Sequence, residues 1–459
     1  MKRFLSIIAL VFAVGALSAQ EYDSPEYVSL GRELPRSKTL PYPTAEEAQA
    51  LGSGAVASKY LRPVTGWTRT EEPDATVFTS KYVIPFVWLS RQAILYVDEA
   101  SGAYEVIING QKVGYAANAF TPAEFNITKA SKEDVNTISI RILKDHWSRR
   151  MEDFVETREP RVGETYVISQ PTIRVRDVVH NTDVDLKSEY ANVEVGLIVK
   201  TESLNPKTAR IHYELIAPDT TVVTQGYKDV TLGMRGEDTV KFMARIPYVL
   251  TWCADMPVRY RLNIKTQIEG RYAEYQSRMI GFRDIDINEE GDFMINGIKT
   301  ELFYRDFDPL KVTEKDIDGE MKPYIDRATR LVSVKRKAKK GDTAVLDFEM
   351  GAVPQNVYRM CDSLGMDVIA QIPINTSKSG LSRRIGGNPS NDPKWKAAFL
   401  DRAETAYRTT CGQASVIGYV MAEESSDGIN LYETYMRLKA LERKRPILYI
   451  EAAGEWNSD

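Results

Sequence analysis

The hydrophobic pattern of this chain changes once, near Phe282, and this change constrains the fold more than any other feature. Before it, short runs with the two-residue alternation of β-strands follow one another. Tyr104 to Ile108 is one of them, and the Asn109-Gly110 pair after it is typical of a tight hairpin. After it, apolar strand-like runs alternate with amphipathic stretches such as Gln355 to Leu364. We therefore expect antiparallel sandwiches first and a parallel sheet covered by helices afterwards.

The length of 459 residues exceeds what one hydrophobic core normally serves and predicts about three domains. A second β series, from about residue 172 to residue 283, divides the first part into two sandwiches. The net charge is −4 and carries no long block of one sign. A nucleic-acid partner is therefore not expected.

The N-terminus has the pattern of a secretory signal peptide. Lys2 and Arg3 precede the apolar segment from Phe4 to Leu17, which ends at the small residues Ser18 and Ala19. No other stretch reaches the 18 or so apolar residues that a membrane-spanning helix needs. We expect residues 1–19 to be removed and the protein to be exported, to the periplasm or the extracellular space, with no membrane span.

Cysteine and histidine are too scarce and too scattered for several kinds of chemistry. The spacing predicts no disulfide scaffold, no metal site, no cofactor site and no Ser-His-Asp triad. The residues concerned are Cys253, Cys361, Cys411, His146, His180 and His212. Carboxylates remain as the candidate catalytic groups.

Motifs from all three parts of the chain resemble those of glycoside hydrolase family 2, the β-galactosidase family. They occur in the family's order. The first part carries 106–115 ("VIINGQKVGY") and 121–128 ("TPAEFNIT"), the second part ends with 250–252 ("LTW") and 281–283 ("GFR"), and the third carries 293–299 ("FMINGIK"), similar to the family's first barrel strand, and 358–369 ("YRMCDSLGMDVI").

The resemblance implies a multidomain β plus α/β fold. A jelly-roll, galactose-binding-like β-sandwich comes first, an immunoglobulin-like β-sandwich second, and a partial TIM-type β/α barrel of about five strands third. The expected ranges are 20–58 for an N-terminal extension, 59–177 for the jelly roll, 178–282 for the immunoglobulin-like sandwich and 283–459 for the incomplete barrel.

The resemblance also indicates where a catalytic acid would lie. Residues 415–426 ("SVIGYVMAEESS") align without a gap with the family's fourth strand, which implies that Glu424 is the general acid/base. Glu423 then replaces the Asn that contacts the sugar. A carboxylate only accepts hydrogen bonds, whereas an amide also donates, so this replacement removes a donor.

The same comparison implies that the nucleophile is missing. Hydrolysis with retention needs two carboxyl groups about 5–5.5 Å apart. In the family, the nucleophile comes from the seventh strand, whereas Ile447 to Glu451 resembles the fifth, shortly before the chain ends at Asp459. A whole barrel takes about 250 residues, more than the range 283–459 provides.

Other family positions also differ. The runs for strands one to three lack the family's polar residues, and the first-domain passage that reaches the family's active site keeps its acidic Glu152 and Asp153. These runs are 302–309 ("LFYRDFDP"), 346–354 ("LDFEMGAVP"), 370–373 ("AQIP") and 146–154 ("HWSRRMEDF").

Three interpretations follow. The protein is a non-catalytic binder of glycan or protein, an active retaining β-glycosidase completed by a downstream frame or a partner, or the product of a decayed gene fragment. A five-stranded piece of a barrel leaves open sheet edges, which are templates for pairing. A protein partner or self-association at the open barrel edge is therefore expected. The sequence does not identify the sugar or the linkage.

Overall fold

The computed structural model describes residues 23–50, 58–155, 159–300, 302–307, 343–348, 353–449 and 458–459, with residues 302–307 and 343–348 described by their backbone. The predicted signal peptide, residues 1–19, lies outside these ranges, as does Glu451. Among the described helices, none is both long and apolar enough to cross a membrane.

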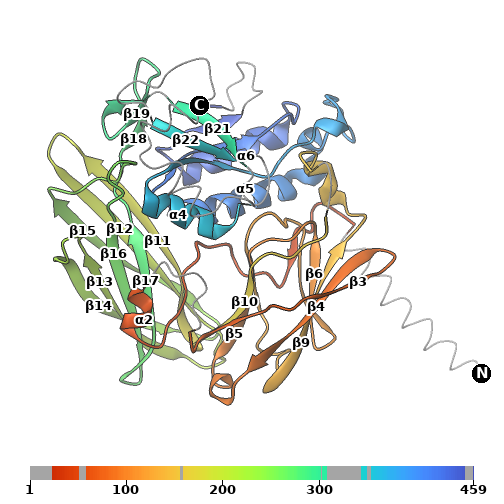
Figure 1. Cartoon of the computed structure of the whole chain (residues 1–459), viewed down its shortest axis with the longest axis horizontal. Helices are drawn as coiled ribbons and strands as arrows, with labels where there is room; N and C mark the ends of the chain where they lie inside the picture. Colours follow the sequence, from red (N-terminus) through yellow and green to blue (C-terminus); the bar gives the residue numbers. More distant parts are fainter. Residues whose placement is uncertain are drawn as a thin grey trace, which may run out of the picture.

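The first unit is a β-sandwich of two antiparallel sheets (Figure 1). One has the order β1-β7-β6-β9-β4-β3 and the other β2-β10-β5-β8. Asn109 and Gly110 have φ angles of 50° and 80° and connect β6 to β7 in the predicted hairpin. The strands are β1 (Ser29–Leu30), β2 (Leu61–Pro63), β3 (Thr68–Glu71), β4 (Ala75–Ile84), β5 (Gln92–Val97), β6 (Tyr104–Ile108), β7 (Gln111–Ala116), β8 (Ala123–Asn126), β9 (Asp134–Leu143) and β10 (Thr165–Gln170).

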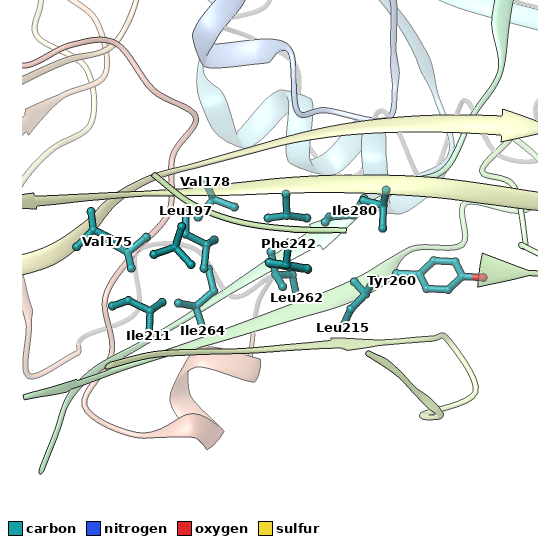
Figure 2. Close-up of a cluster of buried hydrophobic side chains, with 14 of the residues drawn as sticks. Val175, Val178, Leu197, Ile211, Leu215, Phe242, Tyr260, Leu262, Ile264 and Ile280 are labelled. Carbon is teal, nitrogen blue, oxygen red and sulfur yellow. The ribbon is translucent and has the colours of Figure 1, made fainter. Parts of the chain in front are cut away.

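The second unit is a smaller sandwich, with the sheets β11-β12-β15 and β14-β13-β16-β17. Alternate residues of each strand point inward and form one apolar core, which includes Leu197, Phe242 and Leu262 (Figure 2). The strands are β11 (Ile173–Asp185), β12 (Tyr190–Thr201), β13 (Lys207–Ile216), β14 (Val222–Leu232), β15 (Glu237–Pro247), β16 (Tyr260–Ile268) and β17 (Arg271–Ile280).

The third unit contains five parallel strands in the sequential order β21-β22-β23-β24-β25, as in the first part of a β/α barrel. The described helices α4, α5 and α6 alternate with the last three strands and cover the sheet (Figure 1). The bounds are β21 (Leu302–Phe307), β22 (Thr343–Phe348), α4 (Gln355–Leu364), β23 (Asp367–Gln371), α5 (Lys396–Thr410), β24 (Val416–Ala422), α6 (Ile429–Leu441) and β25 (Ile447–Tyr449). The predicted fold class of two sandwiches and a partial barrel is confirmed.

One strand assignment was wrong. The run 293–299, expected as the first barrel strand, forms β19 (Phe293–Ile295) and β20 (Ile298–Lys299) of a small antiparallel sheet with β18 (Ile285–Ile287). Asn296 and Gly297 take φ angles of 49° and 74° and turn the chain back on itself. Positive φ at both central residues gives a tight hairpin. The first strand of the parallel sheet is β21, which lies in the run 302–309 that the family resemblance also assigned to strand one.

The N-terminal segment links the three units. The guanidinium of Arg36 pairs with the Glu124 carboxylate of the jelly roll at 2.6 Å. Tyr42, just before the short helix α2 (Ala45–Gln49), makes an isolated bridge with Tyr275 of the second unit. Arg32 forms an ion pair with Asp401 on α5. These contacts place the segment between the units rather than on a separate surface.

Candidate active site

The carboxyl end of β24 carries the predicted acid/base. β24 ends at Ala422, and Glu423 and Glu424 follow directly. Substrates of β/α barrels bind at the carboxyl ends of the strands. Glu424 is exposed there and has a φ angle of 41°, a left-handed backbone that residues other than glycine rarely adopt. Such strain is typical of functional turns, where the surrounding contacts must hold the backbone in place.

The backbone of Glu423 is held on both sides of the residue. Its amide N–H donates to the carbonyl oxygen of Ile374 at 3.1 Å. Its carbonyl oxygen accepts a hydrogen bond from the Ser425 hydroxyl at 2.6 Å. Glu423 is half-buried, in contrast to Glu424. Glu423, which the family resemblance predicts to replace an Asn, therefore has a fixed backbone position beside the predicted acid.

The turn that carries Glu424 is braced by two neighbouring strands. The buried Ser425 donates its amide N–H to the hydroxyl of Tyr449 on β25 at 3.3 Å. Its hydroxyl accepts from the amide of Thr376, which follows β23, at 3.2 Å. Groups from both neighbouring strands thus hold Ser425. The position of Glu424 therefore depends on β23 and β25 as well as on β24.

The jelly-roll unit reaches this edge through the segment after its short 3₁₀ helix η2 (Trp147–Met151). Glu152 makes a parallel bridge with Asn375, and Asn375 makes a second parallel bridge with Glu423. The amide of Asn375 donates to Met151 O at 3.0 Å, and the amide of Asp153 donates to Asn375 O at 3.1 Å. The first unit thus extends the backbone ladder of the barrel edge up to the predicted site.

A buried ion pair anchors that extension. Arg402 on α5 donates to the Glu152 carboxylate at 2.5 Å and to the carbonyl oxygen of Pro373 at 2.7 Å. Arg402 is 2 % exposed and Glu152 is 1 % exposed. A buried carboxylate needs a counter-charge to offset its lost hydration. Glu152 therefore has a structural role at the junction of the two units.

Asp153, the other acidic residue of this segment, also has a hydrogen-bond partner. Asp153 accepts a hydrogen bond from the backbone amide of Lys378 at 2.7 Å. Partial burial raises the pKa of its carboxyl group, against the opposing effect of that hydrogen bond. Asp153 links the jelly-roll segment to η4 (Ser377–Ser379) after β23.

The loop after β23 is built around one buried amide. Asn388 accepts from the Thr376 hydroxyl at 2.8 Å and from the Ser390 amide at 2.9 Å. Its own NH₂ group donates to Gly380 O at 2.7 Å and to Thr376 O at 3.1 Å. Asn388 and Thr376 are both fully buried, so the base of this loop is a satisfied polar network beside the Glu424 turn.

The sequence prediction located Glu423 and Glu424 and the approach of Glu152 and Asp153, whereas it assigned no role to Asn375, Asn388 or Arg402. An Arg in an amphipathic helix normally indicates a solvated face, so no sequence signal singles out Arg402. The side chains of the drifted positions 302–309 and of 346–352 lie outside the described residues. Within the described ranges, no group of three or more His, Cys, Asp or Glu side chains could hold a metal ion.

Comparison with known proteins agrees with the three units. Residues 15–160 match the sugar binding domain of glycosyl hydrolases family 2, residues 173–283 match a further domain of that family, and residues 353–458 match its TIM barrel domain. The chain belongs to glycoside hydrolase family 2. The resemblance inferred from the motifs is therefore confirmed.

The family's curated members that resemble this chain include β-galactosidases. The one from Priestia megaterium is 24 % identical in an alignment 456 residues long, which covers 95 % of this chain and 41 % of the relative. The one from Pectobacterium atrosepticum is 22 % identical over 92 % of this chain and 40 % of the relative. The chain thus spans about two-fifths of the length of these relatives.

Solved structures of β-glucuronidases share the fold. A β-glucuronidase from Bacteroides uniformis superposes with a TM-score of 0.67 at 16 % identity and covers 91 % of this chain and 52 % of that one. A β-D-glucuronidase from Dictyoglomus thermophilum gives a TM-score of 0.65 at 14 % identity and covers 86 % of this chain and 73 % of that one. At these identities the likeness concerns the fold.

Proposed function

We propose that this chain is an exported family 2 protein of carbohydrate metabolism that binds a glycan at the carboxyl edge of its barrel sheet without hydrolysing it. The exposed Glu424 on its braced turn carries the proposal. A carboxylate on a fixed backbone can accept hydrogen bonds from sugar hydroxyls. The match to the family's sugar binding domain also supports glycan binding.

The absence of hydrolysis is proposed because the acidic groups of the jelly-roll segment that reaches this edge have other partners. Retention requires a second carboxyl group about 5–5.5 Å from the acid. Glu152 is paired with Arg402, and Asp153 accepts from the Lys378 amide. Glu423 cannot donate to a sugar hydroxyl when ionised, as the family's Asn does.

We expect the purified chain to bind lactose and to release no nitrophenol above background from an aryl β-galactoside or an aryl β-glucuronide. Hydrogen bonds to charged groups contribute about 1.5–3 kcal/mol, so Glu424→Ala should weaken lactose binding about tenfold or more. Calorimetric titration measures the binding, and absorbance measures the release.

Glu290→Ala is the matched control, since Glu290 is an exposed glutamate outside the barrel edge. It should leave lactose affinity unchanged. Undiminished binding by Glu424→Ala would remove Glu424 from the site. Nitrophenol release that Glu424→Gln abolishes would contradict the non-catalytic part of the proposal.

A second candidate is an active retaining β-glycosidase whose remaining barrel comes from another polypeptide. The 41 % coverage of the Priestia β-galactosidase favours it. Within the described residues, β21 and β25 have a hydrogen-bonded neighbour on one side each, so added strands could pair there. Co-expression with the product of an adjacent reading frame should then give aryl-glycoside hydrolysis that depends on Glu424.

Export is proposed from the pattern of residues 1–19. Expression of the full chain in a Gram-negative host should yield a periplasmic protein whose N-terminus is Gln20. N-terminal sequencing of the purified protein checks this. A product that keeps Met1 and stays with the cytoplasmic fraction would refute export.

A further inference from the structure

The outward face of the four-stranded sheet in the second unit carries a row of aromatic rings. Tyr227 on β14 lies 5.6 Å from His212 on β13, and His212 lies 5.7 Å from Tyr272 on β17, measured between ring centroids. Tyr275 continues the row, 5.6 Å from Tyr272. β13 and β14 lie at the left edge of the molecule in Figure 1, away from the barrel helices.

Two rings of the row, Tyr227 and Tyr272, are exposed, whereas His212 and Tyr275 are half-buried. Tyr227 is 55 % exposed and Tyr272 is 48 % exposed, whereas Ile211 and Leu215, on the opposite face of β13, are fully buried. The guanidinium carbon of Arg210 lies 4.3 Å from the ring centre of Tyr227 and is itself paired with Asp229 at 2.7 Å. These contacts fix the orientation of the Tyr227 ring without covering it.

A hollow of about 230 Å³ adjoins the row. Strand register places its outward-facing residues in two cross-strand lines, Tyr227-His212-Lys265 and Gln225-Glu214-Asn263. Gly226 and the backbone of Tyr213 lie between these lines.

The polar side chains at the hollow include both hydrogen-bond donors and hydrogen-bond acceptors. The Asn263 amide donates to Glu214 at 3.1 Å and accepts from the Ser277 hydroxyl at 3.0 Å, which orients both groups. Gln267 lies 3.2 Å from the His212 ring nitrogen Nε2. Glu214 and Lys265 contribute one charge of each sign. The hollow therefore offers ring faces, donors and acceptors with no net charge.

We propose that this face of the immunoglobulin-like unit binds a neutral oligosaccharide. A sugar ring has an apolar C–H face, which packs against an aromatic ring, and a rim of hydroxyl groups, which both donate and accept. The hollow is smaller than the usual pocket for a drug-sized ligand and suits one sugar unit. Further units then lie along the tyrosine row. This site is independent of the proposed barrel-edge site.

Cross-strand aromatic pairs also stabilise sheets, by about 0.2–1 kcal/mol each. That role accounts for the contacts within the row. It does not account for the adjoining hollow, in which hydrogen bonds orient the amide of Asn263 and the carboxylate of Glu214. Binding experiments distinguish the two roles, because a purely structural row has no ligand.

The test is calorimetric titration of the Glu424→Ala full chain with cellotetraose, β-1,4-galactotetraose and an oligogalacturonate of equal length. The Glu424→Ala background weakens the proposed barrel-edge site, and the tyrosine variants of this sheet face change this face alone, so the two proposals can fail separately. We expect saturable binding of at least one neutral probe. Loss of one aromatic contact should weaken it about threefold to tenfold in Tyr227→Ala and in Tyr272→Ala.

Tyr248→Ala is the matched control, because Tyr248 is 79 % exposed on the same unit but outside the row. It should leave the affinity unchanged, and circular dichroism should show that every variant is folded at the temperature of the titration. The proposal is overturned if neither neutral probe binds, if only the oligogalacturonate binds, or if Tyr227→Ala and Tyr248→Ala have the same affinity. If this face instead binds a partner protein, neither neutral probe should bind.

Discussion

Replacing Arg402 by leucine should lower the free energy of unfolding by about 3–5 kcal/mol, because it leaves a buried carboxylate without its counter-charge. Glu152, which it pairs with, is 1 % exposed and belongs to the jelly-roll unit. The hydrogen bond to Pro373 O is lost as well. Denaturant unfolding of the wild type and of the variant, followed by circular dichroism, measures the change.

The double variant Arg402→Leu/Glu152→Leu separates charge from packing. With no buried charge left, it should recover most of the loss, since replacing both partners of a buried pair is often neutral. Arg437→Ala is the control, as this side chain is 43 % exposed and pairs with Glu404 on the surface; it should cost about 0–1 kcal/mol. A loss in Arg402→Leu no larger than in Arg437→Ala would show that the pair does not hold the units together.

Trp252→Ala should cost about 3–5 kcal/mol, the usual loss for a large aromatic side chain in a core. Trp252 is fully buried where the immunoglobulin-like unit meets the barrel unit. Its indole N–H donates to the carbonyl oxygen of Asp362 on α4 at 2.9 Å. The Arg283 guanidinium lies 4.6 Å from the ring centre and pairs with the buried Asp367 at 2.5 Å. The same unfolding experiment measures this variant.

Trp252→Phe is the graded comparison. It keeps an aromatic ring under Arg283 and removes the donor to Asp362 O, so we expect a smaller loss, about 1–3 kcal/mol. Equal losses for the two variants would show that the hydrogen bond, and not the packing, determines the contribution of Trp252. Losses below 1 kcal/mol for both would contradict a role at the junction.

Local chemistry made much of the fold predictable. The two-residue alternation and the Asn109-Gly110 turn predicted the β6–β7 hairpin, and the helical period predicted α4 with its observed bounds, Gln355–Leu364. The hairpin at Asn296-Gly297 has the same signal as the first one, yet the family resemblance led to its assignment as a barrel strand.

The surroundings of the candidate site were less predictable. Alignment with the family placed Glu424 after the fourth strand, but the parallel bridges of Asn375 to Glu152 and to Glu423 join three distant parts of the chain. The ion pair of Arg402 with Glu152 spans 250 residues of sequence. The sequence of α5 does not distinguish Arg402 from a solvent-exposed arginine. The sequence pattern therefore gives no information about its pairing with Glu152.

The sequence by itself determined the order of the units, the period of their strands and helices, and the acidic pair at the end of β24, because turns and alternation depend on neighbouring residues. Tertiary structure alone decided which acidic side chains are exposed and which are paired with a positive charge. Glu424 is exposed and Glu152 is buried against Arg402 because a segment of the jelly-roll unit packs on the carboxyl edge of the barrel sheet. Burial and pairing are properties of that packing, and they separate a carboxylate available to a ligand from one that holds the fold together.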